Sequence, residues 1–194
     1  MTRSDSALIT AAQAGDRDAL EQLLRDHYDR IHAVCRRIAG SDRDADDAVQ
    51  ETMIRIVRSL NSFDGRSKLS TWIYRIATNA ALDELRRRSR RPSLSLTSDP
   101  EVSVELPDPG AHDQIDSIAD RMTIDAALNE LPDSFRTVVV LRDLADLDYA
   151  DIADIVGIPV GTVKSRISRG RHQLGELLGN PSPPPERPTS RPTP

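Results

Sequence analysis

The chain has 194 residues, 38% of them hydrophobic, and a formal net charge of −5. This length accommodates one medium-sized domain or two small ones. No apolar run approaches the roughly 20 residues that a membrane-spanning helix needs, and the first residues, MTRSDSALITAAQAGDRD, lack the layout of a secretory signal. We therefore expect a cytoplasmic protein that does not insert into a membrane.

The single cysteine, Cys35, excludes an internal disulfide framework. His32 precedes it on the same stretch, but a structural zinc site needs about four ligands, and no others lie nearby in the sequence. We expect a buried, unreactive thiol on one face of a helix. We expect neither a metal nor a cofactor.

Apolar residues recur at helical spacing along the chain and alternating β-branched runs are almost absent, so the sequence predicts an all-α fold. Asp16 is the expected cap of a long helix that Gly40 ends. The apolar positions of this helix are Leu20, Leu23, Leu24, Tyr28, Ile31, Val34, Cys35 and Ile38. Ser41, with Asp44 three residues later, predicts a capping-box-like start of a second helix. The apolar positions of that helix are Val49, Met53, Ile56, Val57 and Leu60.

A third predicted helix follows the polar loop NSFDGRSK; it begins near Ser70 and is closed by Pro92. At about 100° per residue, one stripe of this helix suits the core: Ile73, Ile76, Ala77 and Ala80. A neighbouring stripe holds Trp72, Arg75, Asn79, Asp83 and Arg86. Cations suit phosphates, and aromatic or amide groups suit unstacked bases, so the second stripe fits the opening of a DNA duplex. Trp72 fits either stripe, because it is also a natural core residue.

Residues 92–113 are rich in Ser, Pro, Asp and Val without a helical period, and we expect them to form a flexible linker. It would join two small helical domains, residues 1–91 and 114–179. Between Ser98 and Asp133 there are ten acidic residues and one basic residue, so the acidic charge of the chain is local. The tail, residues 180–194, is rich in Pro and Ser and is expected to be disordered.

The second domain is expected to contain a helix over residues 114–130 and a helix capped by Asp133, SFRTVVVLRDLA. A short helix capped by Asp148 follows and ends at Gly157. After Pro159 comes a basic helix. Two helices joined by such a tight turn are typical of a helix-turn-helix.

The basic helix has two chemically distinct sides on a helical projection. The apolar side carries Val163, Ile167, Gly170, Leu174, Leu177 and Leu178. The opposite side carries Lys164, Ser165, Ser168, Arg169 and His172, with Arg166 and Arg171 on the flanks. A helix with one apolar side, an opposite side that can form hydrogen bonds and cationic residues on the flanks suits the major groove of DNA. A solvated charged face is the alternative, but Gly157, Pro159 and the preceding capped helix favour DNA binding.

Both predicted domains resemble parts of one family. The second domain is similar to region 4 of bacterial RNA polymerase sigma factors over ALNELPDSFRTVVVLRDLADLDYADIADIVGIPVGTVKSRISRGRHQLGELL. The first resembles region 2 of the extracytoplasmic-function (ECF, group 4) subfamily in DADDAVQETMIRIVRSLNSF and KLSTWIYRIATNAALDELRRR. No segment matches the additional regions 1.1 and 3 of housekeeping sigma factors. The resemblance implies a non-enzymatic specificity subunit, without catalytic residues, that directs core RNA polymerase to promoters.

The resemblance also implies partners and the residues of region 2 that contact them. Core RNA polymerase would bind through the clamp helices of its largest subunit and through its flap, and an anti-sigma factor is an expected further partner. The residues expected at the clamp helices are Asp46, Asp47, Gln50, Glu51 and Arg55. The loop over residues 61–68 and Asn79 would form the pocket for a flipped minus-10 base, beside arginines that follow the DNA backbone. The full minus-10 set is Phe63, Lys68, Trp72, Arg75, Asn79, Arg86, Arg87 and Arg88.

In region 4 the resemblance implies contacts with the minus-35 element. Lys164, Ser165, Ser168 and Arg169 match positions that read bases, and Thr162, Arg166 and Arg171 would contact phosphates. Lys164 stands where the family often has an arginine, and it lacks the two parallel donors of a guanidinium. Ser168 is smaller than the residue often found at its position. The resemblance therefore does not define which minus-35 sequence is preferred. The acidic linker would act as an RNA mimic in the channels of the polymerase or as a solubilising spacer.

Two other functions compete with this interpretation. A stand-alone helix-turn-helix regulator would need a receiver or sensor domain, and the alternating strand–helix pattern of a receiver is missing. An all-α enzyme would need a nucleophile and base constellation, whereas the histidines are scattered and the one cysteine is expected to be buried.

Overall fold

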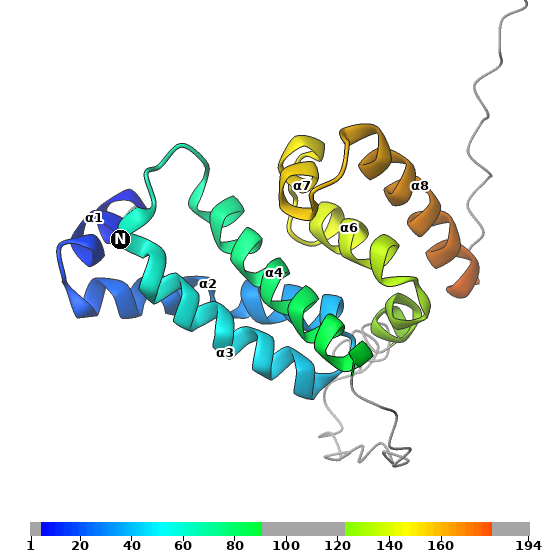
Figure 1. Ribbon diagram of the computed structural model, residues 1–194, viewed down its shortest axis with the longest axis horizontal. Coiled ribbons are helices and arrows are strands. Elements are labelled where there is room, and N and C mark those ends of the chain that lie inside the picture. Colours follow the sequence, from blue (N-terminus) through cyan, green and yellow to red (C-terminus); the bar gives the residue numbers. More distant parts are fainter. Residues whose placement is uncertain (1–4, 91–122, 180–194) are drawn as a thin grey trace, which may run out of the picture.

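The computed structural model describes residues 5–90 and 123–179, and within these ranges the chain forms helices joined by turns, without a strand (Figure 1). The all-α prediction is therefore confirmed for the described part. The expected linker, the expected tail and residues 114–122 of the predicted helix lie outside it, while residues 123–130 are helical as predicted.

The N-terminal helical group begins with α1 (Asp5–Gln13) and α2 (Arg17–Ala39). It continues with α3 (Asp42–Ser59), the single 3-10 turn η1 (Leu60–Ser62) and α4 (Leu69–Arg90). Helices α2, α3 and α4 pack against one another, and α1 lies against α2 and η1 (Figure 1). Helix α1 was not predicted from the sequence, because this short helix buries only two residues, Leu8 and Ala12.

The predicted start and end of α2 and the predicted start of α3 are confirmed by their capping contacts. The Asp16 side chain accepts hydrogen bonds from the backbone N–H groups of Asp18 and Ala19. Gly40 ends α2 in the left-handed conformation, with φ of 78°. At α3, the Ser41 hydroxyl oxygen accepts from the Asp44 N–H at 3.2 Å and the hydroxyl donates to Asp44 Oδ2 at 2.8 Å.

Two predicted apolar positions point to solvent instead of the core. Tyr28 is 46% exposed and stacks its ring on His32, whereas the preceding residue, His27, is 8% exposed and occupies the buried side of α2. On α3, Val57 is 47% exposed while Ile56 is fully buried. One residue corresponds to about 100° of rotation, so a shift of one position separates the core from the surface.

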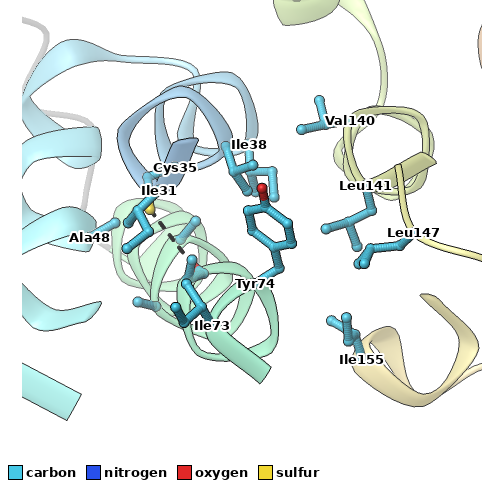
Figure 2. Packing of buried hydrophobic residues seen from close by; sticks show 14 of the residues in the cluster. Ile31, Cys35, Ile38, Ala48, Ile73, Tyr74, Val140, Leu141, Leu147 and Ile155 are labelled. Carbon is cyan, nitrogen blue, oxygen red and sulfur yellow. Dashed lines mark hydrogen bonds between the residues drawn. The ribbon is translucent and has the colours of Figure 1, made fainter. Parts of the chain in front are cut away.

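Cys35 is fully buried, as predicted, and its Sγ lies 3.9 Å from the carbonyl oxygen of Ala77 on α4 (Figure 2). Burial raises the pKa of the Cys35 thiol to about 11. The neutral thiol is therefore the form at physiological pH, and a buried neutral thiol is a poor nucleophile and metal ligand.

The C-terminal helical group contains residues 123–130, α6 (Asp133–Asp143), α7 (Tyr149–Val156) and α8 (Val160–Leu177). Asp148 caps α7 by accepting from the Asp151 N–H at 2.8 Å, and Gly157 ends it in the left-handed conformation, as predicted. The predicted Asp133 cap is wrong. Asp133 is already the first helical residue, and its Oδ1 accepts a hydrogen bond from Arg136 Nη2 at 2.6 Å. Pro132 occupies the cap position and makes no side-chain hydrogen bond there.

The two helical groups pack on each other through α2 with α6 and through α4 with α7. The Tyr74 side chain of α4 lies between Ile38 of α2 and Leu141 and Leu147 of the second group, and these buried residues belong to one continuous core (Figure 2). Polar contacts surround this interface: Arg37 Nε lies 3.0 Å from Asp125 Oδ1. At Gly40 the approach is so close that an added Cβ would lie 2.9 Å from Asn129 Oδ1.

Helix α8 crosses α6 at Gly170, and this contact has no room for a side chain. A Cβ at Gly170 would lie 2.7 Å from Val139 Cγ2 and 3.4 Å from Phe135 Cβ. We expect Gly170→Ala to lower the free energy of unfolding by about 1–2 kcal/mol, because overpacking exceeds the gain in helix propensity. Urea denaturation measures this change. Gly161→Ala is the matched control on the same helix: it meets no atom within 4 Å, so it should not destabilise, and equal effects of both variants would contradict the prediction.

Candidate nucleic-acid interface

Helix α8 separates an apolar side from a polar side. Val163, Ile167 and Gly170 are buried, while the four expected base-reading residues are exposed. Those four are Lys164, Ser165, Ser168 and Arg169. The apolar side ends sooner than predicted, because Leu177 and Leu178 are 49% and 37% exposed.

The exposed side of α8 is held in place by neighbouring helices. Lys164 Nζ lies 5.4 Å from the centre of the Tyr149 ring on α7, and Arg142 lies 5.2 Å from the same ring. A cation over an aromatic ring is attracted to it, so Tyr149 restrains the direction of Lys164. This role of Tyr149 was not predicted, because only the folded turn brings α7 and α8 together.

The flanking residues of α8 differ in their surroundings. Arg171 donates from Nε to Asp143 Oδ2 at 3.0 Å, and this hydrogen bond raises the pKa of Arg171. Arg166 and Thr162 are half-buried, and the Ser165 hydroxyl donates to the Thr162 carbonyl oxygen at 3.0 Å. The first turn of α8 has no acidic residue, so the positive end of the helix dipole there favours an anion such as a phosphate.

A second polar surface lies on α4 and the loop before it. Arg75, Asn79 and Lys68 are exposed. Trp72 is half-buried and its ring lies 5.3 Å from the Phe63 ring at a tilt of 53°. Trp72 therefore packs partly against the core and partly against the Phe63 ring of the loop. This position is compatible with both interpretations from the sequence, a core residue and a residue that contacts unstacked bases.

Every arginine expected at the minus-10 DNA already has a carboxylate beside it. Arg86 pairs with Asp83 at 3.1 Å, Arg87 with Glu84 at 3.0 Å, Arg88 with Asp44 at 3.7 Å and Arg75 with Asp154 at 3.9 Å. The pairs of Arg86 and Arg75 are solvent-exposed, and such pairs contribute only about 0–1 kcal/mol each, so a phosphate can replace the carboxylate there at little cost. Glu84 and Asp44 are buried, so Arg87 and Arg88 also compensate the charge of a buried carboxylate.

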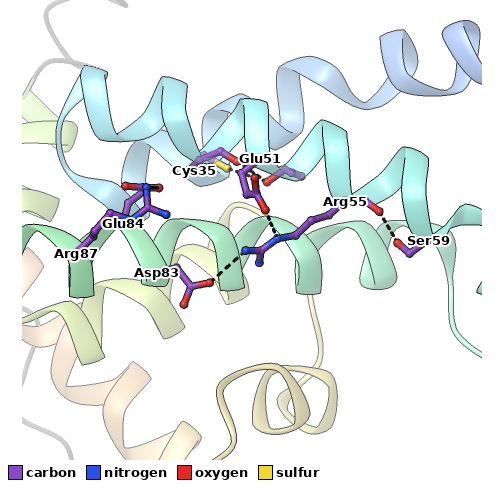
Figure 3. Close-up of polar contacts among 9 residues, drawn as sticks. Cys35, Glu51, Arg55, Ser59, Asp83, Glu84 and Arg87 are labelled. Carbon is purple, nitrogen blue, oxygen red and sulfur yellow. Dashed lines mark hydrogen bonds and ion pairs between the residues drawn. The ribbon is translucent and has the colours of Figure 1, made fainter.

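The residues expected to bind core polymerase share helix α3. Asp46, Asp47 and Gln50 are exposed. Arg55 Nε donates to Glu51 Oε1 at 2.7 Å, and Arg55 Nη2 donates to Asp83 Oδ2 on α4 at 3.4 Å (Figure 3). The bond to Glu51 raises the pKa of Arg55. Glu51 and Arg55 thus also join α3 to α4.

Two apolar residues on α3 were not expected at this surface. Ile54 and Val57 are 38% and 47% exposed, beside the polar candidates. Exposed apolar groups within a polar surface are common at protein–protein contacts. The signal in the sequence was the apolar run MIRIV, which has more apolar residues than one face of α3 can bury.

Neither a metal centre nor a membrane span is found among residues 5–90 and 123–179. No cluster of His, Cys, Asp or Glu there has the arrangement to hold a metal ion. None of the helices in these ranges has the length and apolar character to cross a bilayer.

Comparison with known families matches both helical groups. The model of sigma-70 region 2 matches residues 23–91 and that of sigma-70 region 4 matches residues 121–174. Helices α2–α4 carry the first match, and α6–α8 lie within or overlap the second. Together the two models cover more than half of the chain.

Whole-chain relatives agree with these matches. The chain is 36% identical over 180 residues to the ECF RNA polymerase sigma factor SigW of Bacillus subtilis, covering 88% of this chain and 94% of SigW. It is 37% identical over 177 residues to the ECF sigma factor SigM of Mycobacterium tuberculosis, covering 91% and 86% of the two chains.

A solved structure supports the fold. The sigma factor RpoE of Bartonella quintana, crystallised with the anti-sigma factor NepR, superposes with a TM-score of 0.62 at 26% identity. The match covers 82% of this chain and 96% of that chain. With region 2, region 4 and whole-length relatives in agreement, the chain belongs to the ECF RNA polymerase sigma factors of the sigma-70 family.

Proposed function

We propose that this protein binds core RNA polymerase and directs it to promoters, reading the minus-35 element with α8 and opening the minus-10 element with α4 and the preceding loop. The observation that carries the proposal is the presence of two separate cationic, hydrogen-bonding surfaces, one in each family-matched region. A stand-alone helix-turn-helix regulator would have no use for the first. As in the family, the chain would act by binding, so we assign it no catalytic residue.

In region 4, α8 would enter the major groove of the minus-35 element. Arg169 would donate to a guanine edge and Lys164 would donate from a single ammonium, directed by Tyr149. Ser165 and Ser168 would contact base edges or phosphates. Thr162 and Arg166 would hold phosphates at the positive end of the helix, and Arg171 would do so while tied to Asp143.

In region 2, α4 would lie along the unpaired minus-10 strand. Arg75 and Arg86 would exchange their exposed carboxylate partners for phosphates. Arg87 and Arg88 would contact phosphates while they stay beside the buried Glu84 and Asp44. The Phe63 and Trp72 rings, which are tilted by 53° to each other, would offer aromatic faces to unstacked bases, with Asn79 and Lys68 as hydrogen-bond donors. Stacking on aromatic rings compensates for the few kcal/mol that each unstacked base costs.

Helix α3 would dock on the clamp helices of the polymerase. Asp46, Asp47 and Gln50 are exposed and would form charged and polar contacts, and Ile54 and Val57 would add apolar area. Asp46 would do so beside His32, whose Nε2 lies 4.0 Å from Asp46 Oδ1. Helix α3 packs on α2 and α4, and in Figure 1 it lies on the side of α4 opposite α7. Polymerase binding through α3 would therefore not require the two groups to separate first. Region 4 would then bind the flap.

Promoter binding, in contrast, would require separation. The minus-10 and minus-35 elements lie about 25 base pairs apart, or roughly 85 Å at 3.4 Å per pair. In the closed arrangement α7 contacts α4, and α4 itself is only about 33 Å long at 1.5 Å per residue. We infer that the closed arrangement belongs to the free protein and that the groups move apart on the promoter. An anti-sigma factor that favours the closed arrangement would inhibit transcription.

A run-off transcription assay tests the proposal. Core polymerase would transcribe a pooled promoter library at fixed salt, with and without this protein. We expect promoter-specific transcripts only when the protein is present, enriched in one minus-10 and one minus-35 sequence. Binding of the protein to DNA without polymerase, with no specific transcript, would instead support a stand-alone regulator and contradict the proposal.

A further inference from the structure

Gln13, the last residue of α1, links that helix to the turn after α3. Its Nε2 donates to the carbonyl oxygens of Leu60 and Phe63, each at 2.9 Å. A glutamine amide has two N–H hydrogens, so both donors can be used at once. One half-buried side chain therefore holds both ends of the turn η1.

This turn sets the position of Phe63. The Phe63 N–H donates to the Leu60 carbonyl oxygen at 3.0 Å, so the Leu60 oxygen accepts from both Phe63 and Gln13. The Phe63 ring then packs against Trp72 on α4. A shift of the turn would move the Phe63 ring along Trp72 and change the aromatic surface at the start of the loop.

A pocket of about 390 Å³ lies between α1 and the rest of the loop. Its lining includes Ile9, Thr10 and Gln13 on α1, Phe63 and Asp64 of the loop, and Leu69 at the start of α4. Residues 64–68 are exposed. With open space beneath the loop, the two hydrogen bonds of Gln13 fix its first residues relative to α1.

We propose that Gln13 is a positioning residue for minus-10 recognition, acting through the turn and Phe63. The inference rests on the proposed function, because it assumes that the loop reads the minus-10 element. Gln13 lies before residues 23–91, which match the region 2 model, so the family match does not assign it this role.

The test compares Gln13→Met with Gln13→Lys in run-off transcription. Both side chains are unbranched and suit a helix, but Met cannot donate a hydrogen bond whereas the Lys ammonium can. We expect Gln13→Met to reduce the discrimination between the preferred and substituted minus-10 bases by roughly tenfold, the size expected for losing two hydrogen bonds. Gln13→Lys should retain most of this discrimination. The minus-35 preference and the affinity for core polymerase should not change in either variant.

Gln22→Met is the matched control, because Gln22 lies on the exposed side of α2 and donates only to Asp26. It should discriminate as the unaltered protein does. If Gln13→Met lowers thermal stability or total transcript while its base discrimination stays intact, Gln13 is merely structural and the inference is overturned. In that outcome the proposed function stands. If the unaltered protein yields no promoter-specific transcript, the proposed function fails and takes the inference with it.

Discussion

Replacing both Lys164 and Arg169 with alanine is expected to lower minus-35-dependent transcription by about 100-fold, since each base contact contributes about 1–3 kcal/mol. Both side chains are exposed on the outer side of α8, away from the buried Val163 and Ile167. Their removal should leave the core of region 4 intact. The measurement is run-off transcription on a promoter with an intact minus-35 element and on the same promoter with that element scrambled.

The comparison of these two templates isolates the role of α8. On the scrambled template the double variant and the unaltered protein should be nearly equal, because neither can use base contacts there. Arg25→Ala serves as the charge control, since Arg25 is exposed on α2 and pairs only with Glu21. An equal loss on both templates would mean that Lys164 and Arg169 contribute general attraction to DNA and do not read its sequence.

A phosphate contact should respond differently from a base contact. Arg166→Ala is expected to weaken binding to all sequences alike and to reduce the slope of log affinity against log salt by about one. The Lys164 and Arg169 variants should instead change which bases are preferred at the minus-35 element. Measured on one set of templates, this contrast distinguishes the phosphate contact of Arg166 from the base contacts of Lys164 and Arg169.

Binding of core polymerase and promoter DNA is expected to separate the two helical groups by tens of ångströms. The span of roughly 85 Å between the promoter elements exceeds what the closed packing of α4 on α7 allows. Fluorescence energy transfer measures the separation, with dyes on cysteines introduced at exposed Arg58 on α3 and Leu177 on α8. Because Cys35 is fully buried with a raised pKa, dyes should attach only at the introduced sites.

The contact between α4 and α7 indicates how to shift the equilibrium between the closed and open arrangements without DNA. Arg75 pairs with Asp154 at 3.9 Å, and the Thr71 hydroxyl donates to Asp151 Oδ2 at 3.3 Å. We expect Asp154→Lys to favour the open arrangement by about tenfold, because an exposed attraction of up to about 1 kcal/mol becomes a repulsion of similar size. A lysine in the last turn of α7 suits the helix dipole, so α7 itself should remain folded.

A charge swap distinguishes this cause from a general charge effect. Arg75→Asp combined with Asp154→Arg should restore the closed population, because the pair is rebuilt with opposite signs. Asp26→Lys on α2 makes the same charge change away from the interface and should leave energy transfer unchanged. Unaltered energy transfer in Asp154→Lys, or on adding polymerase and promoter, would show that the closed arrangement is not the state that must open.

Whether a feature could be predicted from the sequence depends on how far apart in the chain the interacting residues lie. Asp16, Ser41 and Asp148 were identified as caps because each accepts from N–H groups two or three residues away. Asp133 was misassigned because one residue of difference at a helix start, set by Pro132, decides whether a carboxylate caps the helix or pairs along it. Tyr28 and Val57 were misplaced because the exact rotation of a helix depends on what packs against it.

The sequence by itself determined the all-α class, the two ends of α2 and of α7, the start of α3 and the two sides of α8, because periodicity and capping are properties of short segments. Only the tertiary structure decided that Gln13 holds Leu60 and Phe63, that Tyr149 restrains Lys164, and that α7 covers part of α4. These contacts join residues brought together by the packing of separate helices. No local pattern encodes such pairs, since their geometry depends on how every helix between them fills the common core.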